Sequence, residues 1–130
     1  MLVEWPLAIE RSDVETAVAH VGKADALLKA KDVEGALREL TRSAYLDPYS
    51  PRAHELLARA HLMRNEKEKA MNELQMSLWC REDPAVRLEL ARVLADVGRT
   101  AEARAEAEKV LKVQPDNAAA RAIFRKSPEN

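Results

Sequence analysis

The stretch ALLKAKDVEGAL, residues 26–37, decides the fold because it returns twice, in altered form, further along the chain. The second copy is AHLMRNEKEKAM, residues 60–71, and the third is VLADVGRTAEAR, residues 93–104. One small residue near the end of each copy sets a period of 34 and then 33 residues: Ala36, Ala70 and Ala103. A period in this range is typical of helical solenoids, in which each unit buries its apolar face by stacking on its neighbours.

The composition is that of an all-α protein. Hydrophobic residues make up 47% and charged residues 33% of the 130 residues, and there are only three glycines, which favours helices over turn-rich folds. A net charge of -1 provides no field that would attract nucleic acid or an anionic membrane, so we expect neither as a partner.

The location of the protein is weakly constrained. No apolar run approaches the roughly 18–20 residues that cross a bilayer, and residues 1–11 lack the pattern of a secretory signal. The single cysteine, Cys80, cannot form an internal disulfide. We therefore expect a soluble, cytoplasmic protein, although a chain trimmed of its signal would look the same.

Start and stop signals predict seven helices, the first six forming three antiparallel pairs and the seventh capping the last pair. Their expected spans are 13–30, 33–46, 51–64, 67–80, 84–97, 101–113 and 117–126. This divides the chain into an apolar N-terminal arm, a repeat domain and a short tail. The boundaries are 1–12 for the arm, 13–126 for the domain (repeats at about 17–50, 51–83 and 84–117, cap helix 118–126) and 127–130 for the tail.

The helix ends are marked by specific residues. Ser50 and Asp83 each precede a proline, which places a capping side chain before a residue that needs no amide partner. Ser12 with Glu15, and Asn65 with Glu68, have the spacing of capping boxes, while Asp32 and Thr100 occupy the equivalent places in the other units. Gly98 suits the left-handed residue that ends a helix.

In these features the chain resembles the tetratricopeptide repeat family across roughly residues 17–117. The third unit matches its pattern of leucine, small residues and a final proline best: Leu90, Ala91, Leu94, Gly98, Ala103, Ala107, Val110 and Pro115. The resemblance implies a right-handed α-solenoid that binds proteins and carries no catalytic activity. A plain helical bundle or a related helical repeat is the alternative.

The resemblance also implies a concave groove lined by the first helix of each pair. The residues expected there are Arg52, Glu55, Leu56, Arg59, Leu62 and Met63 in the second unit, and Leu88, Glu89, Arg92 and Asp96 in the third, with Val18, Val21, Gly22, Asp25 and Lys29 in the first. Arg59 and Arg92 hold the same place in successive units, so a partner peptide with acidic and apolar side chains would suit them. Alternatively, Glu55, Glu89 and Asp96 neutralise the arginines.

Some family members grip chaperone tails through asparagines in this groove. The corresponding residues here are Gly22, Leu56 and Glu89, so we do not expect that mode of binding.

No catalytic or metal site is expected. His20 and His54 share a repeat position, and His61 lies seven residues beyond His54, about 10 Å along a helix and too far to share an ion. The sequence contains no phosphate-binding loop, nucleophile elbow or Cys-x-x-Cys pair. We therefore predict a protein that is not an enzyme and needs no cofactor.

A second surface is suggested by aromatic residues. Tyr45 and Trp79 share a repeat position near the ends of successive second helices, and Trp5 lies in the apolar arm. Together the three aromatic residues would form an interface through which copies of the chain self-assemble, and this is the alternative function. In the other interpretation of Tyr45 and Trp79, each side chain packs under the following turn. The arm itself is expected to fold back on the first pair, lie in the groove or dock on another subunit.

Overall fold

The computed structural model describes residues 10–126, all of whose regular structure is helical. Residues 1–9 of the predicted arm (1–12), with Trp5, and the tail at 127–130 lie outside the described residues. The seven helices are α1 (Arg11–Lys29), α2 (Val33–Leu46), α3 (Pro51–Met63), α4 (Lys67–Cys80), α5 (Pro84–Asp96), α6 (Thr100–Val113) and α7 (Ala118–Arg125). Each predicted helix is present, and its ends lie within two residues of the prediction.

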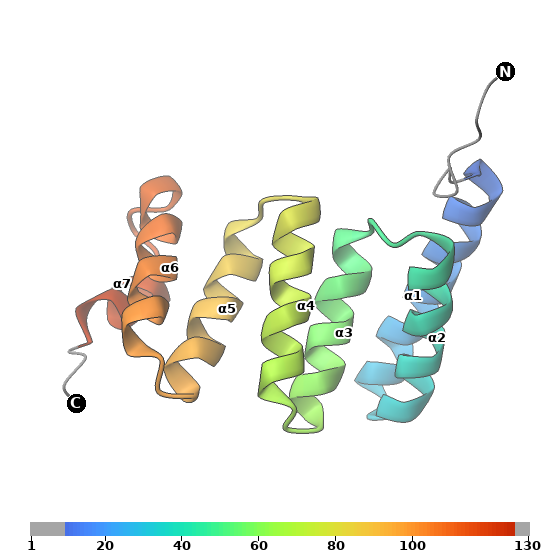
Figure 1. The fold of residues 1–130 in the computed structure, drawn as a ribbon, viewed down its shortest axis with the longest axis horizontal. Helices are drawn as coiled ribbons and strands as arrows, with labels where there is room; N and C mark the ends of the chain where they lie inside the picture. Colours follow the sequence, from blue (N-terminus) through green and yellow to red (C-terminus); the bar gives the residue numbers. More distant parts are fainter. Residues whose placement is uncertain (1–9, 127–130) are drawn as a thin grey trace, which may run out of the picture.

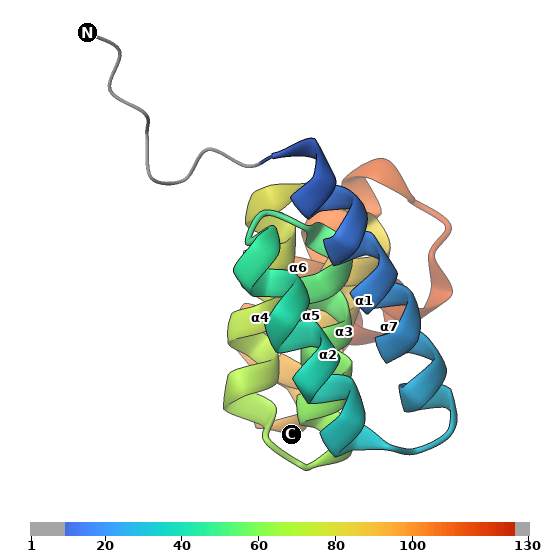
Figure 2. The ribbon, with the colours of Figure 1, turned by 90° about the vertical axis from the view of Figure 1, so that its right-hand side faces the viewer.

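The helices form a solenoid of antiparallel pairs, as expected. The pairs α1–α2, α3–α4 and α5–α6 follow one another along the long axis of the molecule (Figure 1), and within each pair the two helices pack most extensively. Figure 2 looks along this stack, with the α1–α2 pair nearest the viewer. Helix α7 packs on α6 and α5 and covers the face that a further pair would use.

Side chains cap several helices at their N-termini. Asp32, Ser50 and Asn117 each accept a hydrogen bond from the amide three residues ahead, and Asp83 accepts one from Ala85, so each satisfies an amide without a helical partner.

The two predicted capping boxes are wrong. Helix α1 begins one residue before Ser12, with Glu10 at its N-cap, and α4 has Glu66 at its N-cap, in both cases without a side-chain capping bond. Asn65 cannot act as an N-cap because it adopts a left-handed conformation with φ of 60°.

That left-handed residue recurs in every repeat. Lys31, Asn65 and Gly98 have φ values of 66°, 60° and 83°, and they lie 34 and 33 residues apart. In each turn the following amide bonds back to a carbonyl five residues earlier, as in Asp32 to Leu27 at 2.8 Å. This is the Schellman arrangement, so all three first helices end in the same way.

The cores of the repeats are equivalent. Ala36, Ala70 and Ala103 are all 0% exposed, each on the second helix of its pair, which confirms the period read from the sequence. Ser43 and Ser77, in equivalent places, donate hydrogen bonds to carbonyls 26 residues earlier, and Val110 fills the same place in the third repeat without one.

A second cross-link joins the helices of each pair. His20 Nδ1 lies 2.5 Å from Glu39 Oε2, His54 Nδ1 lies 2.7 Å from Glu73 Oε2, and the Arg87 guanidinium pairs with Glu106. The three pairs have the same spacing of 19 residues. We call these the intra-repeat staples; they tie each first helix to its second helix at one level.

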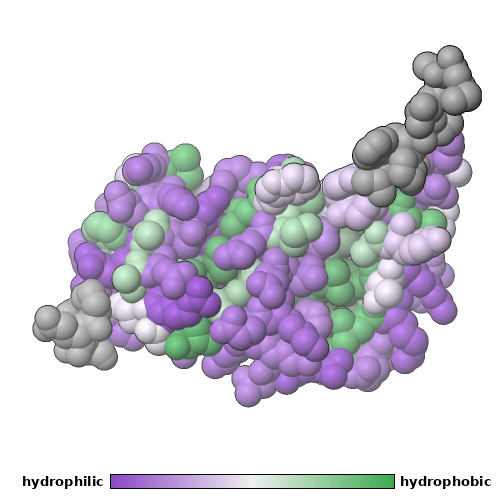
Figure 3. All heavy atoms as spheres, viewed as in Figure 1, coloured by the Kyte–Doolittle hydropathy of each residue, from purple (hydrophilic) through white to green (hydrophobic). Residues whose placement is uncertain are grey.

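No helix in the described part of the chain is long and apolar enough to cross a lipid bilayer. On the face shown in Figure 3, hydrophilic residues dominate, and hydrophobic residues gather in patches between the helices.

Candidate binding groove

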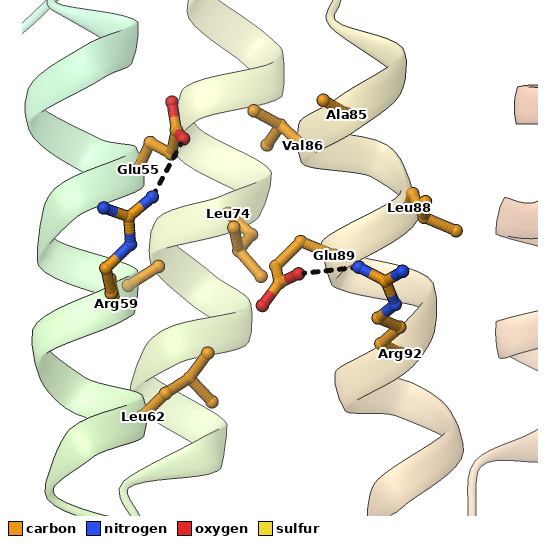
Figure 4. Close-up of a pocket in the computed structure, with 10 residues that line it drawn as sticks. Glu55, Arg59, Leu62, Leu74, Ala85, Val86, Leu88, Glu89 and Arg92 are labelled. Carbon is orange, nitrogen blue, oxygen red and sulfur yellow. Dashed lines mark hydrogen bonds and ion pairs between the residues drawn. The ribbon is translucent and has the colours of Figure 1, made fainter. Parts of the chain in front are cut away.

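A depression of about 300 Å³ opens between α3 and α5 (Figure 4). These two helices barely touch, whereas α4 packs on both, so the side chain of Leu74 on α4 forms the floor. The walls come from Glu55, Ala58, Arg59 and Leu62 on α3 and from Ala85, Val86, Leu88, Glu89 and Arg92 on α5. We call this depression the α3–α5 groove.

The groove combines an apolar floor with one arginine on each wall. Arg59 Nη2 lies 3.7 Å from Glu55 on its own helix, and Arg92 Nη1 lies 3.5 Å from Glu89 on its own helix. The side chains of the two arginines are 47% and 53% exposed. The predicted neutralisation by Glu55 and Glu89 therefore occurs, but through contacts much longer than the 2.7–2.9 Å of a strong charge-assisted hydrogen bond.

Asp25 on α1 extends the charged network toward the first repeat. Its Oδ1 lies 3.6 Å from Arg52 Nη2 and 3.9 Å from Arg59 Nη1, and its Oδ2 lies 3.2 Å from Lys29 Nζ. Oδ1 is a buried atom with no hydrogen-bond partner within the described part of the chain. The ammonium of Lys29, and then the guanidinium groups of Arg52 and Arg59, lower the pKa of Asp25, so this carboxylate stays charged and competes for the arginines.

Asp25, Arg59 and Arg92 occupy the same repeat position. This position therefore carries an acidic side chain in the first repeat and a guanidinium group in the second and third. Asp25 was predicted to line the groove, but its pairing with Arg52 and Arg59 of α3 was not predicted from the sequence.

The structure places six of the ten predicted residues of the second and third units in the α3–α5 groove. They are Glu55, Arg59, Leu62, Leu88, Glu89 and Arg92. Arg52 lies beside the groove in the Asp25 network, while Met63 and Asp96 are exposed at the C-terminal ends of their helices. Leu74 of α4 lies between the arginine-bearing walls formed by α3 and α5.

Leu56 was predicted to line the groove, and this prediction is wrong. Its side chain is 0% exposed and packs in the core between the first and second repeats with Ala24, Leu28 and Leu40. A partner in the groove therefore cannot contact it. The family-based assignment placed it on the inner surface, but here this face of α3 is used to stack on α1 and α2.

The two aromatic residues at the helix ends are exposed. Tyr45 is 88% and Trp79 is 74% exposed, so the alternative in which each packs under the following turn is wrong. Lys112 occupies the same position in the third repeat.

The chemistry of the remaining candidates is limited. No group of three His, Cys, Asp or Glu residues within residues 10–126 is arranged to hold a metal ion. All three histidines bond through Nδ1 to a glutamate, as His61 does to Glu66 at 3.0 Å. Partial burial raises the pKa of the Cys80 thiol, which disfavours the reactive thiolate.

Comparison with known folds agrees with this architecture. In solved structures, the first tetratricopeptide domain of Spaghetti (RPAP3), bound to the HSP90 peptide SRMEEVD, superposes with a TM-score of 0.81 at 18% identity, covering 92% of this chain and 93% of that one. The second such domain of human RPAP3, in complex with the HSP70 peptide SGPTIEEVD, gives 0.80 at 18% identity, covering 91% and 98%. The Arabidopsis OM64 domain gives 0.77 at 19% identity, covering 85% and 93%. At these identities the likeness shows the fold.

Sequence comparison identifies the family. No curated protein matches the chain at a significant level. Two family models described as tetratricopeptide repeat match residues 27–78 and residues 84–109. With three equivalent helix pairs between residues 11 and 113, the chain belongs to the tetratricopeptide repeat family.

Proposed function

We propose that this protein is a non-catalytic interaction module that binds a segment of a partner protein in the α3–α5 groove. The observation that carries the proposal is the pair of arginines, Arg59 and Arg92, on opposite walls of a depression whose apolar lining includes the partly exposed Leu62. A peptide with a carboxylate next to apolar side chains fits this combination of charge and surface.

The arginines keep donors available for a ligand. Each guanidinium has five N–H groups, and the contacts to Glu55 and Glu89 occupy few of them at distances of 3.5–3.7 Å. Weak pairs between half-exposed side chains contribute little stability, so a ligand carboxylate can replace them at small cost.

The solved relatives support a protein or peptide partner. Two of them are bound to peptides that end in Glu-Glu-Val-Asp. In this chain, Gly22, Leu56 and Glu89 stand where some family members have asparagines, and Leu56 is buried. We therefore propose an acidic and apolar ligand held by arginines across the groove, and not a chaperone tail held by asparagines.

The test is charge reversal at both walls. We expect Arg59→Glu with Arg92→Glu to abolish binding of peptides selected from a display library for affinity to the native protein, measured by fluorescence anisotropy. Both side chains are about half exposed, so the helical circular dichroism and melting temperature should change little. The matched control reverses Arg38 and Arg125, which are exposed and lie outside the groove. Undiminished binding to the doubly reversed groove variant would refute the proposal.

Self-assembly through the N-terminal arm and the helix-end aromatics is the second candidate. The observation in its favour is the exposure of Tyr45 and Trp79. Sedimentation of the intact chain and of a chain lacking residues 1–9 tests it, since self-assembly predicts a larger species that the shortened chain does not form. A monomer in both cases rules it out.

A further inference from the structure

A small apolar depression lies between α1 and α2 at the end of the molecule where α1 begins. It is lined by His20 from α1 and by Thr41, Arg42, Tyr45 and Leu46 from α2, with a predominantly apolar surface. We call these five residues the helix-end surface. It lies at the opposite end of the first pair from the Lys31 turn, and it is distinct from the α3–α5 groove.

Tyr45 is the most exposed of the tyrosines and tryptophans that the structure describes. The buried core contains no tyrosine or tryptophan within the described residues, and the three that the structure describes, Tyr45, Tyr49 and Trp79, are 88%, 44% and 74% exposed. Tyrosine and tryptophan carry large apolar areas and are enriched where proteins make contacts. An apolar depression beside the most exposed of these side chains indicates a contact surface for another protein segment.

The first nine residues are attached close to this surface. The bond from Ser43 Oγ to the Ala17 carbonyl, 3.0 Å long, sets the level of α2 against α1. Glu10 lies seven residues before Ala17, about 10 Å further along the axis, and Tyr45 lies two residues beyond Ser43, about 3 Å in the same direction. Glu10 and Tyr45 are thus offset by about 7 Å along the axis and by one interhelical distance of about 8–10 Å.

The reach of the segment is more than sufficient. Nine extended residues span about 30 Å, which is about two and a half times that separation, so the segment is long enough to reach the helix-end surface. A segment tethered this close is present at a local concentration in the millimolar range, which favours contact within one chain over contact between chains.

The composition of the segment complements the surface. Residues 1–9 include Leu2, Val3, Trp5, Leu7 and Ile9, and their one charged side chain is Glu4. The surface offers Tyr45 and Leu46 as apolar contacts and Arg42, whose side chain is 63% exposed and lies 3.7 Å from Glu39. Arg42 therefore has donors for a second carboxylate such as that of Glu4.

We propose that residues 1–9 fold back over the helix-end surface of the same chain, with Trp5 against Tyr45. The segment then covers the apolar depression between α1 and α2, and Glu4 pairs with Arg42. This proposal does not depend on ligand binding in the α3–α5 groove, because it uses none of the residues of that groove.

Tryptophan fluorescence of the full chain tests the proposal. The sequence has two tryptophans, so Trp79→Phe leaves Trp5 as the single reporter. We expect emission from Trp5 at a shorter wavelength, and weaker quenching by acrylamide, than in a free peptide of residues 1–11. Adding Tyr45→Ala should return both quantities toward the values of the free peptide. Because Tyr45 is exposed, circular dichroism should show that this variant is folded.

A matched control and a dilution series separate the outcomes. Met63→Ala, which removes an exposed apolar side chain at the C-terminal end of α3, should leave the emission of Trp5 unchanged. Solvent-like emission from Trp5 in the Trp79→Phe protein overturns the proposal, and so does shielding that survives Tyr45→Ala. Shielding that disappears on hundredfold dilution overturns it as well, because the surface is then covered by a second copy.

Discussion

The buried staple of the second repeat makes stability depend on pH in a direction that the structure determines. His54 is 7% exposed; its Nδ1 lies 2.7 Å from Glu73 on α4, and its Nε2 lies 2.8 Å from the Pro48 carbonyl in the α2–α3 connection. A neutral imidazole carries one N–H and can donate to only one of them, so only the imidazolium satisfies both. The Glu73 carboxylate, then the Pro48 carbonyl and the charge of Asp47, raise the pKa of His54 against the opposing effect of burial.

The sign of the effect follows from this raised pKa. The protonated histidine is favoured in the folded state, so its stabilisation is fully present below the pKa of the unfolded chain, near 6.5. As the pH rises through the raised pKa of the folded state, the folded protein loses a proton that stabilised it, and the free energy of unfolding decreases.

The perturbation is Glu73→Gln, which keeps the shape of the side chain and removes its charge. A hydrogen bond to a charged group contributes about 1.5–3 kcal/mol and a neutral one about 1 kcal/mol. We therefore expect the substitution to lower the free energy of unfolding by about 1–2 kcal/mol near pH 6 and by about 0.5 kcal/mol near pH 9. Urea denaturation followed by circular dichroism at several pH values between these limits measures the difference between variant and native protein.

The third repeat provides the control. Arg87 takes the place of His54 and pairs with Glu106 and Glu82, and an arginine stays charged throughout this range. The loss caused by Glu106→Gln should therefore be the same at pH 6 and pH 9. If the loss from Glu73→Gln is equally independent of pH, His54 is not protonated as described and the reasoning is refuted.

Four other substitutions test the fold and the groove. Gly98→Ala should destabilise the protein by about 1 kcal/mol in urea denaturation, because a Cβ there meets nothing within 4 Å and only the left-handed backbone opposes it. Lys31→Gly, at the same repeat position, should stabilise the protein by up to about 1 kcal/mol. If both substitutions change the free energy of unfolding in the same direction, this reasoning is wrong. Leu74→Ala should cost about 2–5 kcal/mol in the same assay because its side chain is 1% exposed, and a smaller loss would mean that the groove floor collapses to fill the space. Asp25→Asn should raise the affinity for an acidic peptide about 2–5-fold in anisotropy titrations, because it releases Arg59 from a weak ion pair. Unchanged affinity would exclude Asp25 as a competitor.

The helices were predictable because their ends are determined by local chemistry. Ser50 and Asp83 before proline have the same meaning in any helical protein, and the structure confirms both. The left-handed turn residues were only partly predictable. Gly98 is an obvious candidate, whereas Lys31 has no preference for that conformation and is identified only by its phase relative to Gly98.

The groove was less predictable because it depends on how the helices cross. Nothing in the sequence distinguishes Leu56, which is buried, from Leu62, which lines the groove; the difference is the side of α3 that faces the first repeat. The charge inversion from Asp25 to Arg59 is visible in the sequence, but the 3.9 Å contact between them exists only because α3 packs across α1.

The intra-repeat staples, in contrast, follow from a rule that the sequence could have supplied. In an antiparallel helix pair both helices rise equally per residue, so residues at equal distance from the turn face each other. The midpoint of the sequence between His20 and Glu39 falls between residues 29 and 30, and the midpoint between Ala17 and Ser43 is residue 30, the C-cap of α1. The pairs at 54 and 73 and at 87 and 106 are centred in the same way, beside the C-caps of α3 and α5. Reflection about each turn therefore pairs each of these three basic residues with a glutamate, so the positions of all three staples could have been predicted from the sequence.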